Sequence, residues 1–563
     1  MTSLARFRRE RGWVWLVLCA LAAYGAWGWW TLGRPVPLPD APPGRIACVS
    51  YAPFRLPGES PLDIHAFISP QRIDADLQVL SQRFDCVRTY SQGQGLSAVP
   101  QIAQRHGMQV LLGIWLGRDR KANAVQVRQG ISIAQQYPKV VRGVIVGNEV
   151  LLRGDLSEAS LAAYVREVRA AVSVPVSYAD VWEFWLKHRA LASAVDYITI
   201  HILPYWEDHP VGPDHAVHHV AEVYARVRAA FPGRRVMIGE TGWPSAGRPR
   251  QAAIPSLVNE ARYLREFLDY AATVHMPYNV IEAFDQPWKR ALEGTAGGYW
   301  GIFDTQARPK FNMTGPVVEV PRWWLGWLAG AAGMLLFVLC GRRPLSGDDT
   351  RAWVALGLAG FASGTALAWQ YRQLAFAARN AWEWAVGLGA CAAALVTALM
   401  LARAIAACLT RTLESPEPQP ETPQRDTLPS HEVDAAARSA SAATKRSNPV
   451  GIEAWVCCGW LLALAYYGLL LVSDGRYRDY PLGLFALPAV GYSLLAWLGT
   501  NKAPLPLLET RFLACLVPLL AAIVVLQENG ITQAAWLWLA LNIALAWPVL
   551  HRWRQARLQA QQA

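Results

Sequence analysis

Two glutamates stand where apolar, strand-like runs of the sequence end. The run 146–149 (VGNE) ends in Glu149, and the run 238–240 (IGE) ends in Glu240. In a parallel α/β barrel, the carboxyl ends of all strands open onto the same face. Two carboxylates delivered to that face can flank one glycosidic bond and divide the acid and nucleophile roles between them.

The two glutamates belong to a longer pattern in which short β-rich apolar runs alternate with amphipathic stretches. The runs are Ile46–Tyr51, Cys86–Tyr90, Gln109–Ile114, Val140–Val146, Val174–Ser177, Tyr197–His201, Arg235–Ile238 and Tyr278–Phe284. Eight strands separated by helices within about 270 residues are typical of a (β/α)8 barrel. We therefore predict the α/β class with a TIM barrel, in which Glu149 and Glu240 follow strands four and seven.

Helix signals between the runs agree with this fold. Ser69-Pro70 offers an N-cap and a proline at the first helical position, and Gly107 is placed to end a short helix. A doubly wound open sheet is the competing fold. It requires a glycine-rich phosphate turn after its first strand, and the segment 50–53 (SYAP) is not one.

The composition of the chain predicts a membrane part. Of 563 residues, 53% are hydrophobic and only 17% are charged, and the chain has 26 tryptophans. Eight apolar segments are candidate membrane spans. They are 12–33, 322–340, 352–370, 384–408, 453–473, 481–499, 511–527 and 531–549. The net charge of +11 is spread over the ends of these segments, which favours membrane topology over nucleic-acid binding.

These patterns divide the chain into a barrel and an all-α multi-span transmembrane domain. We predict a cytoplasmic N-terminus (1–11), a transmembrane signal-anchor (12–33), a Pro-rich linker (34–44), the catalytic barrel (45–318), three transmembrane helices (319–410), a disordered cytoplasmic loop (411–450), and four transmembrane helices with a cytoplasmic tail (451–563). The Pro, Ser, Thr, Glu and Ala content of the loop is typical of disorder.

The distribution of basic residues predicts the orientation of the spans. Ten of them share one side with the N-terminus: Arg342, Arg343, Arg351, Arg411, Lys445, Arg446, Lys502, Arg511, Arg552 and Arg554. The positive-inside rule makes that side the cytoplasm, so both termini lie there and the barrel lies in the periplasm of a bacterial inner membrane. Arg372, Arg379, Arg476 and Arg478 are exceptions.

Two cysteines, Cys48 and Cys86, fall in the predicted barrel on its first two strands. They can pair in an oxidising compartment or remain as two buried thiols. The sequence has no CxxC and no His-rich pattern, so we predict neither a metal site nor a cofactor.

The separation of the two carboxyl groups decides the chemistry. A retaining glycosidase needs them about 5–5.5 Å apart, whereas an inverting enzyme leaves about 6.5–9.5 Å for a water molecule. We expect Glu149 to be kept protonated by its surroundings and to donate to the leaving oxygen, while ionised Glu240 attacks the anomeric carbon.

The motifs resemble glycoside hydrolase family 17, the β-1,3-glucanase family among the retaining enzymes with carboxylates on strands four and seven. The matching words are GNE at 147–149, ETGWPS at 240–245, VRTY at 87–90, LPY at 203–205, and FD at 284–285 followed by YWGIF at 299–303. The words DQPWK at 285–289 and EG at 293–294 are similar to membrane-bound bacterial members described as β-(1,6)-glucan synthases or glucanosyltransferases. Leu203 stands where the family motif has a tyrosine.

The resemblance implies roles for individual residues. Glu149 is the implied acid/base, Glu240 the nucleophile, Asn148 a ligand of the sugar 2-hydroxyl, and Tyr205 the group that orients the nucleophile. The implied substrate-binding residues are Arg88, Tyr90, Trp243, Asp285, Trp288, Lys289, Glu293 and Trp300. Alternatives stay open: the tryptophans can be core residues, Arg88 a counter-ion of Glu240, and Lys289 with Glu293 a local ion pair. His201 is expected to be a hydrogen-bonded residue inside the barrel.

Three functions follow, in order of preference. The first is a membrane-anchored retaining enzyme that cleaves β-1,3-glucan and transfers the glycosyl unit to another glucan, by remodelling, branching or β-1,6 linkage formation. The second is an endo-β-1,3-glucanase, and the third is a non-catalytic glucan-binding or export component. The expected partners are a β-glucan substrate and acceptor, inner-membrane lipid and, as an option, a glucan synthase or export protein, with no nucleic acid.

Overall fold

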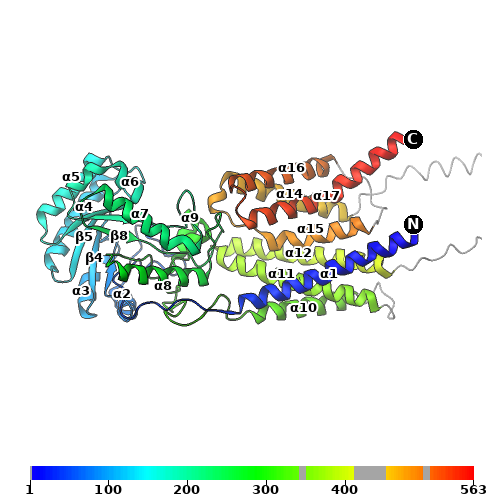
Figure 1. The fold of residues 1–563 in the computed structure, drawn as a ribbon, viewed down its shortest axis with the longest axis horizontal. Helices are drawn as coiled ribbons and strands as arrows, with labels where there is room; N and C mark the ends of the chain where they lie inside the picture. The colour runs from blue at the N-terminus through cyan, green and yellow to red at the C-terminus, as the bar shows by residue number, and fades with distance from the viewer. Residues whose placement is uncertain (1–2, 342–349, 411–451, 499–507, 563) are drawn as a thin grey trace, which may run out of the picture.

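The computed structural model describes residues 3–341, 350–410, 452–498 and 508–562. Figure 1 shows two parts, an α/β barrel at one end and a bundle of long helices at the other. The predicted disordered loop 411–450 lies outside the described residues, as do Arg342, Arg343 and Lys502 from the topology argument.

The barrel contains a seven-stranded sheet in which sequential strands are neighbours and every pairing is parallel. Its strands are β2 (Val49–Ser50), β3 (Cys86–Arg88), β4 (Gln109–Ile114), β5 (Val141–Asn148), β6 (Val176–Val181), β7 (Ile198–His201) and β8 (Val236–Glu240). Each coincides with one of the first seven predicted runs to within a few residues. This order results when every crossover is a helix on the outside of the sheet.

The eighth run, 278–284, closes the sheet without forming a regular strand. Tyr278 forms a parallel bridge to Ile238 of β8, and Val280 forms one to Val49 of β2. The Val280 amide donates to the Cys48 carbonyl at 3.0 Å, and its carbonyl accepts from the Ser50 amide at 2.9 Å. The run therefore bridges the two edges of the sheet, and the predicted (β/α)8 fold class is confirmed.

Helices cover the outside of the barrel. They are α2 (Pro70–Leu80), α3 (Val99–Arg105), α4 (Arg120–Gln136), α5 (Glu158–Ala171), α6 (Trp182–Lys187), α7 (Ala216–Ala230) and α8 (Leu257–Thr273), whereas α9 (Arg290–Gly297) lies at the end of the barrel that faces the bundle (Figure 1). Ser69 caps α2 by accepting from the Arg72 amide, as predicted, and Gly107 follows α3 with φ of 66°.

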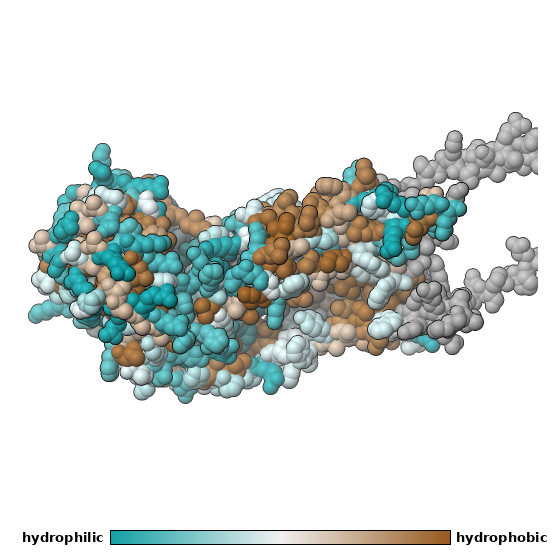
Figure 2. Space-filling view, turned by 45° about the horizontal axis from the view of Figure 1, so that its top comes forward, coloured by the Kyte–Doolittle hydropathy of each residue, from teal (hydrophilic) through white to brown (hydrophobic). Residues whose placement is uncertain are grey.

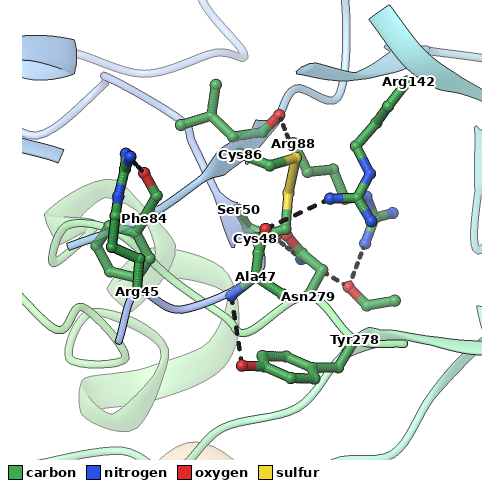
Figure 3. Close-up of a disulfide and its surroundings, with 12 residues drawn as sticks. Arg45, Ala47, Cys48, Ser50, Phe84, Cys86, Arg88, Arg142, Tyr278 and Asn279 are labelled. Carbon is green, nitrogen blue, oxygen red and sulfur yellow. Dashed lines mark hydrogen bonds between the residues drawn. A yellow bond between two sulfur atoms is a disulfide. The ribbon is translucent and has the colours of Figure 1, made fainter. Parts of the chain in front are cut away.

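One layer of the barrel interior consists of side chains contributed by or next to each strand. Its members are Cys48, Cys86, Leu111, Ile145, Ala179, Tyr197 and Met237. Cys48 and Cys86 form a disulfide inside this layer, so the structure selects pairing over two free thiols (Figure 3). The bond links the chain at the start of β2 to its neighbour β3.

The chain enters and leaves the barrel side by side. β1 (Pro35–Val36), which lies in the predicted linker, pairs antiparallel with β9 (Val317–Val318). The helix that precedes the barrel therefore ends, and the first helix after the barrel begins, beside this strand pair.

The bundle contains α1 (Ser3–Leu32), α10 (Trp324–Gly341), α11 (Thr350–Ala377), α12 (Ala381–Thr410), α14 (Ile452–Ser473), α15 (Leu482–Trp497), α16 (Leu508–Gln527) and α17 (Gln533–Gln562). Within the described residues, seven of these are long and apolar enough to cross a membrane, and α15 is a shorter apolar helix. Apolar surface gathers over the bundle, whereas the barrel surface is mostly hydrophilic (Figure 2). The helices thus indicate a membrane-associated protein.

Both chain ends lie at the end of the bundle that is remote from the barrel (Figure 1).

The four arginines that departed from the positive-inside pattern all have acidic partners. Arg372 pairs with Glu319 at 3.2 Å and Arg379 with Glu383 at 2.5 Å. Arg476 lies 3.8 Å from Asp208, and Arg478 lies 3.1 Å from Asp474.

Candidate active site

Glu149 is presented by a distorted end of β5. Gly147 has φ of 84° and Glu149 has φ of 54°, both in the left-handed region that L side chains rarely adopt. The pairing of β5 with β6 shifts register between Ile145 and Asn148. A side chain at residue 147 would collide with Val150, so only glycine fits there. Strained backbone of this kind concentrates at functional sites, where it aims a side chain.

Glu240 ends β8, and His201 ends the neighbouring strand β7. One carboxylate oxygen of Glu149, one of Glu240 and one ring nitrogen of His201 all lie within 4.8 Å of one another. His201 Nδ1 lies 2.8 Å from Glu149 Oε1, and its Nε2 lies 3.7 Å from Glu240 Oε1. Closed-barrel geometry thus brings together two carboxylates that lie far apart in the sequence.

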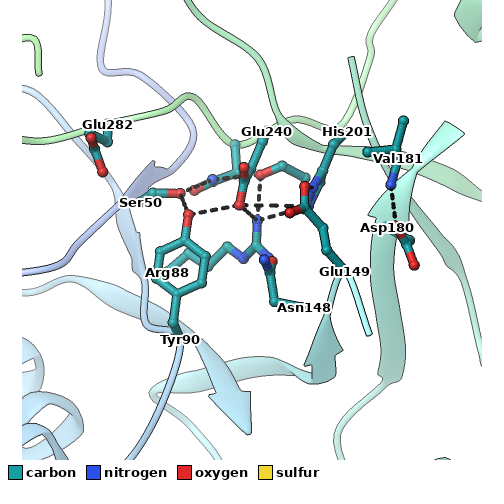
Figure 4. A network of polar contacts seen from close by, with 12 residues as sticks. Ser50, Arg88, Tyr90, Asn148, Glu149, Asp180, Val181, His201, Glu240 and Glu282 are labelled. Carbon is teal, nitrogen blue, oxygen red and sulfur yellow. Dashed lines mark hydrogen bonds and ion pairs between the residues drawn. The ribbon is translucent and has the colours of Figure 1, made fainter. Parts of the chain in front are cut away.

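Arg88 and Tyr90, from β3 and the residues after it, hold Glu240 in place (Figure 4). Arg88 Nη1 donates to Glu240 Oε1 at 3.2 Å, and the Tyr90 hydroxyl donates to the same oxygen at 2.8 Å. Arg88 Nη2 donates to Asn148 Oδ1 at 2.6 Å. Because both donors converge on Oε1, neither of them occupies Oε2, which can face a substrate.

Arg88 is buried, with only 1% of its side chain exposed. It therefore acts as the counter-ion of Glu240 and the anchor of Asn148 rather than as an open sugar-binding group. Burial and the charge of Glu240 raise the pKa of Tyr90 well above its ordinary value, which keeps its hydroxyl protonated as a donor.

The electrostatics of Glu149 differ from the sequence-based expectation. Burial favours its neutral form, but the hydrogen bond and the electrostatic interaction with His201, together with the positive charges of Arg153 and Arg88, outweigh burial and lower its pKa. The protonated Glu149 expected from the sequence therefore stays a prediction for the substrate-bound site, whereas in the free site the pKa of Glu149 is lowered. The reason is the 2.8 Å contact with His201, which sequence spacing did not reveal.

Other polar residues, which the sequence analysis did not single out, support this centre. The Tyr178 hydroxyl donates to Asp180 and accepts from the Leu151 amide at 3.0 Å, which fixes the loop after Glu149. Asn279 Nδ2 donates to Ser50 Oγ at 2.8 Å, and Ser50 Oγ lies 2.9 Å from the Tyr90 hydroxyl. Their signal in the sequence is only that each polar residue lies within or beside a buried strand.

Three aromatic residues of the predicted site belong to the packed core around it. Tyr205 donates its hydroxyl to the Arg248 carbonyl at 2.8 Å, so Tyr90, and not Tyr205, contacts the predicted nucleophile. Trp243 is 1% exposed and donates to the Ile254 carbonyl, and Trp300 is 3% exposed. Both tryptophans thus have the surroundings of core residues, the alternative to sugar binding that the sequence left open.

The remaining predicted residues lie at the end of the eighth run. Asp285 is buried, accepts from the Gly301 amide and pairs with Lys310 at 3.0 Å. Lys289 pairs with Glu282 at 2.9 Å rather than with Glu293. Trp288 is half-buried and donates to Gln286 Oε1 at 2.7 Å.

Two further carboxyl groups follow β8 in the chain, of which Glu282 is buried and Glu293 is half-buried. Burial raises the pKa of Glu282 to about 7, although Lys289 opposes the shift. The pKa of Glu293 is also raised by burial, and the charges of Glu149 and Glu240 contribute to this shift.

Glu149, His201 and Glu240 also have the ligand types and spacing of a metal site among the described residues. Arg88 already places its guanidinium 3.2 Å from Glu240, where a bound cation would be repelled. The arrangement fits a pair of carboxylates balanced by the protein's own cations. Such an arrangement is typical of enzymes in which two carboxyl groups act on one covalent bond.

Comparisons with known proteins agree with this class. Residues 48–301 match the model of the BtgE/BtgC glycoside hydrolase domain family. The chain is 26% identical over 232 residues to a probable β-glucosidase, btgE, of Aspergillus fumigatus, which is 40% of each protein. It is 25% identical over 258 residues to a glucan 1,3-β-glucosidase of Arthroderma benhamiae, covering 42% of this chain and 83% of that protein.

Among solved structures, a family 17 β-1,3-glucanosyltransferase of Rhizomucor miehei is 26% identical, with a TM-score of 0.43. The match covers 48% of this chain and 97% of that one. The family-model match and the curated relatives support the predicted resemblance: residues 48–301, the barrel, are similar to a glycoside hydrolase domain. The bundle lies outside the matched residues.

Proposed function

We propose that this protein is a membrane-anchored retaining enzyme that cleaves β-1,3-glucan and transfers the glycosyl unit to another glucan. The observation that carries the proposal is the approach of Glu149 and Glu240 oxygens to within 4.8 Å at the barrel mouth. This separation agrees with the shorter spacing, about 5–5.5 Å between carboxyl groups, of retaining enzymes. The relatives named as glucan 1,3-β-glucosidases support the choice of substrate.

In the first step, Glu240 attacks the anomeric carbon, and the bond to the leaving sugar breaks as Glu149 donates its proton to the glycosidic oxygen. Arg88 and Tyr90 hold Glu240 Oε1 while Oε2 forms the ester bond. In the second step, Glu149 removes the proton from an acceptor hydroxyl, which attacks the anomeric carbon and releases Glu240. A sugar hydroxyl as acceptor gives transfer, whereas water gives hydrolysis.

The proposed acid needs a proton that the free site disfavours. Entry of a sugar displaces water and can compete with His201 for Glu149, which raises the pKa of Glu149. Once Glu240 is esterified, its negative charge is gone, and Glu149 is then better suited to act as a base.

The proposed location is the periplasmic face of a bacterial inner membrane, with both termini in the cytoplasm. The basic residues of the sequence support this orientation. The Cys48–Cys86 disulfide also supports it, because such bonds persist in oxidising compartments.

The test is to incubate the full chain in detergent with laminari-oligosaccharides and to analyse the lengths and linkages of the products. Products longer than the substrate are expected, and products that are only shorter would leave plain hydrolysis as the function. A Glu240→Gln variant should lose at least about 10⁴-fold in kcat, since it removes the nucleophile. It should also escape covalent labelling by an activated fluoro-glucoside. Normal labelling of this variant would contradict the assignment, and normal biological output would favour a non-catalytic glucan-binding protein.

A further inference from the structure

One sector of the barrel rim contacts the helix ends and turns of the bundle that face the barrel. Arg248, on the loop after β8, donates to the Arg478 carbonyl and to the Tyr480 hydroxyl, both at 2.7 Å. The same guanidinium pairs with Glu528, in the turn between α16 and α17, at 2.5 Å. Arg290 donates to the Phe376 carbonyl at the end of α11 at 2.7 Å. The barrel is thus attached to the bundle through the side on which its strands end, which is also the side of the two glutamates.

The segment 474–480 between α14 and α15, called the outer loop, makes several further contacts with the barrel. The Arg476 guanidinium donates to the Trp206 carbonyl at 2.8 Å. Asp479 accepts from the Thr295 hydroxyl. Gly294 has φ of 69°, and a side chain there would collide with the Tyr477 carbonyl, so the two backbones touch.

Tyr477 of the outer loop forms one aromatic cluster with the barrel. Its ring centroid lies 5.9 Å from that of Trp206, which follows β7 and His201. The Trp206 and Trp300 rings are nearly parallel at 6.4 Å. Tyr477 is 37% exposed and Trp206 is half-buried, so part of this cluster is open to solvent.

The cluster is continuous with the candidate active site. Trp300 accepts through its carbonyl from the Glu282 amide at 3.0 Å, at the strand end next to Glu240. Gly294, which the outer loop contacts, directly follows Glu293, whose pKa is raised by burial and in part by the charges of Glu149 and Glu240. The buried Trp300 Nε1 has no hydrogen-bond partner among the described residues.

From these contacts we infer that the outer loop of the membrane part forms one wall of the sugar-binding cleft, and that Tyr477 together with Trp206 binds a glucosyl unit of the glucan chain. The inference rests on the proposed function. Pyranose rings present C–H faces that pack on aromatic rings, and guanidinium groups donate to sugar hydroxyls. Arg476 lies 5.5 Å over the Trp206 ring and can supply such a donor.

The assignment gives the helical bundle a part in substrate recognition. Tyr477 lies outside residues 48–301, the part matched to the glycoside hydrolase family. A barrel without the bundle would therefore lack one side of its cleft, and the substrate range of this chain would differ from that of a free-standing barrel.

Kinetics of the full chain in detergent test the inference with Tyr477→Ala and Tyr477→Phe variants. With laminariheptaose as substrate, Tyr477→Ala should raise KM about fivefold and leave kcat within about twofold of wild type, because a binding contact alone is lost. Tyr477→Phe retains the ring and should restore KM. Tyr466→Ala removes an exposed tyrosine of α14 that lies within the bundle and serves as the control.

An unchanged KM for Tyr477→Ala would overturn the inference. A lower kcat and a lower thermal midpoint that Tyr477→Phe does not rescue would also overturn it. Tyr477 would then only stabilise the contact between the barrel and the bundle. Both results leave the proposed function standing if the wild-type chain turns over laminari-oligosaccharides. A wild-type chain without any turnover contradicts the proposed function and, with it, this inference.

Discussion

Buried charged side chains gather in the barrel, whereas the buried polar side chains of the described bundle helices are uncharged. The barrel buries Arg55, Asp76, Arg88, Asp180, Glu240, Arg248, Arg250, Glu260, Arg265, Glu282 and Asp285. The bundle with its turns buries Ser363, Thr365, Thr397, Thr510, Thr532 and Asn542. Several of these bond to their own helix: Ser363 Oγ donates to the Ala359 carbonyl at 2.7 Å, and Asn542 donates to the Trp538 carbonyl at 2.8 Å.

The difference follows from what surrounds each part. Burying a charge costs roughly several kcal/mol unless the charge is paired and hydrogen-bonded. In the barrel, Arg88 and Glu240 form such a pair. The barrel holds such pairs where chemistry needs them. Helices packed against apolar surroundings satisfy their backbone internally and tolerate hydroxyl and amide groups that bond within the same helix. Polar substitutions should therefore matter more in the barrel than in the bundle.

The largest effect is expected at Lys310, which lies 3.0 Å from both Glu260 and Asp285. Burial raises the pKa of Glu260 to about 8 and that of Asp285 to about 6, although Lys310 opposes both shifts. Lys310→Met leaves two buried carboxyl groups without a cation and should lower the free energy of unfolding by about 3–5 kcal/mol.

Thermal denaturation in one detergent measures this change as a lower midpoint. Lys139→Met, at an exposed position, provides the matched control. Equal midpoints for the two variants would show that the buried charges of the barrel need no such pairing.

A smaller effect, on pH dependence, is expected at His201, whose hydrogen bond and charge lower the pKa of Glu149. Glu149 must be protonated to donate in the first step, so kcat/KM falls on the alkaline side as it ionises. His201→Asn removes the imidazole, raises the pKa of Glu149 and should move the alkaline limb up by about one pH unit.

The measurement is the pH profile of kcat/KM on a laminari-oligosaccharide. His106→Asn removes a histidine that pairs with Asp74 on α2 and should leave the profile unchanged. If His201→Asn lowers kcat/KM at every pH and leaves the alkaline limb at the wild-type pH, His201 only maintains the structure of the site and does not set the pKa of Glu149.

The smallest effect comes from a pair of serines that tests the comparison directly. Ser177 Oγ of β6 donates to the Tyr197 carbonyl at 2.6 Å and lies 2.7 Å from Thr199 Oγ1, so it links two strands. Ser177→Ala should lower the free energy of unfolding by about 1–2 kcal/mol. Ser363→Ala, in α11, should change it by less than about 0.5 kcal/mol, because only a bond within its own helix is lost. Thermal midpoints in one detergent compare the two, and a larger loss at Ser363 would reverse the comparison.

Local patterns predicted the strands and the strand-end acids well. The runs that end at Glu149 and Glu240 are strands β5 and β8, because a buried parallel strand needs an apolar run of limited length. The resemblance, and not a local pattern, implied that Tyr205 orients Glu240, and the structure places the Tyr205 hydroxyl on the Arg248 carbonyl. Whether a tyrosine reaches Glu240 depends on the stagger between strands, and the closed sheet brings Tyr90 there instead.

The number of membrane spans was predicted less accurately than the positions of the strands. Seven of the described helices are long enough to cross a membrane, and the predicted segment 481–499 corresponds to the 16-residue helix α15. Hydropathy locates an apolar segment, but the length of its helix also depends on the turns and partners at its ends.

The sequence by itself determined the alternation of strands and helices, the two carboxylates at strand ends and the apolar spans, because periodicity and composition are properties of short segments. Only the tertiary structure decided that Cys48 meets Cys86, that His201 contacts Glu149, and that the outer loop touches the barrel rim. Those contacts join residues 38, 52 and 270 positions apart. They depend on how the barrel closes and how the bundle packs against it, which no short stretch of the chain specifies.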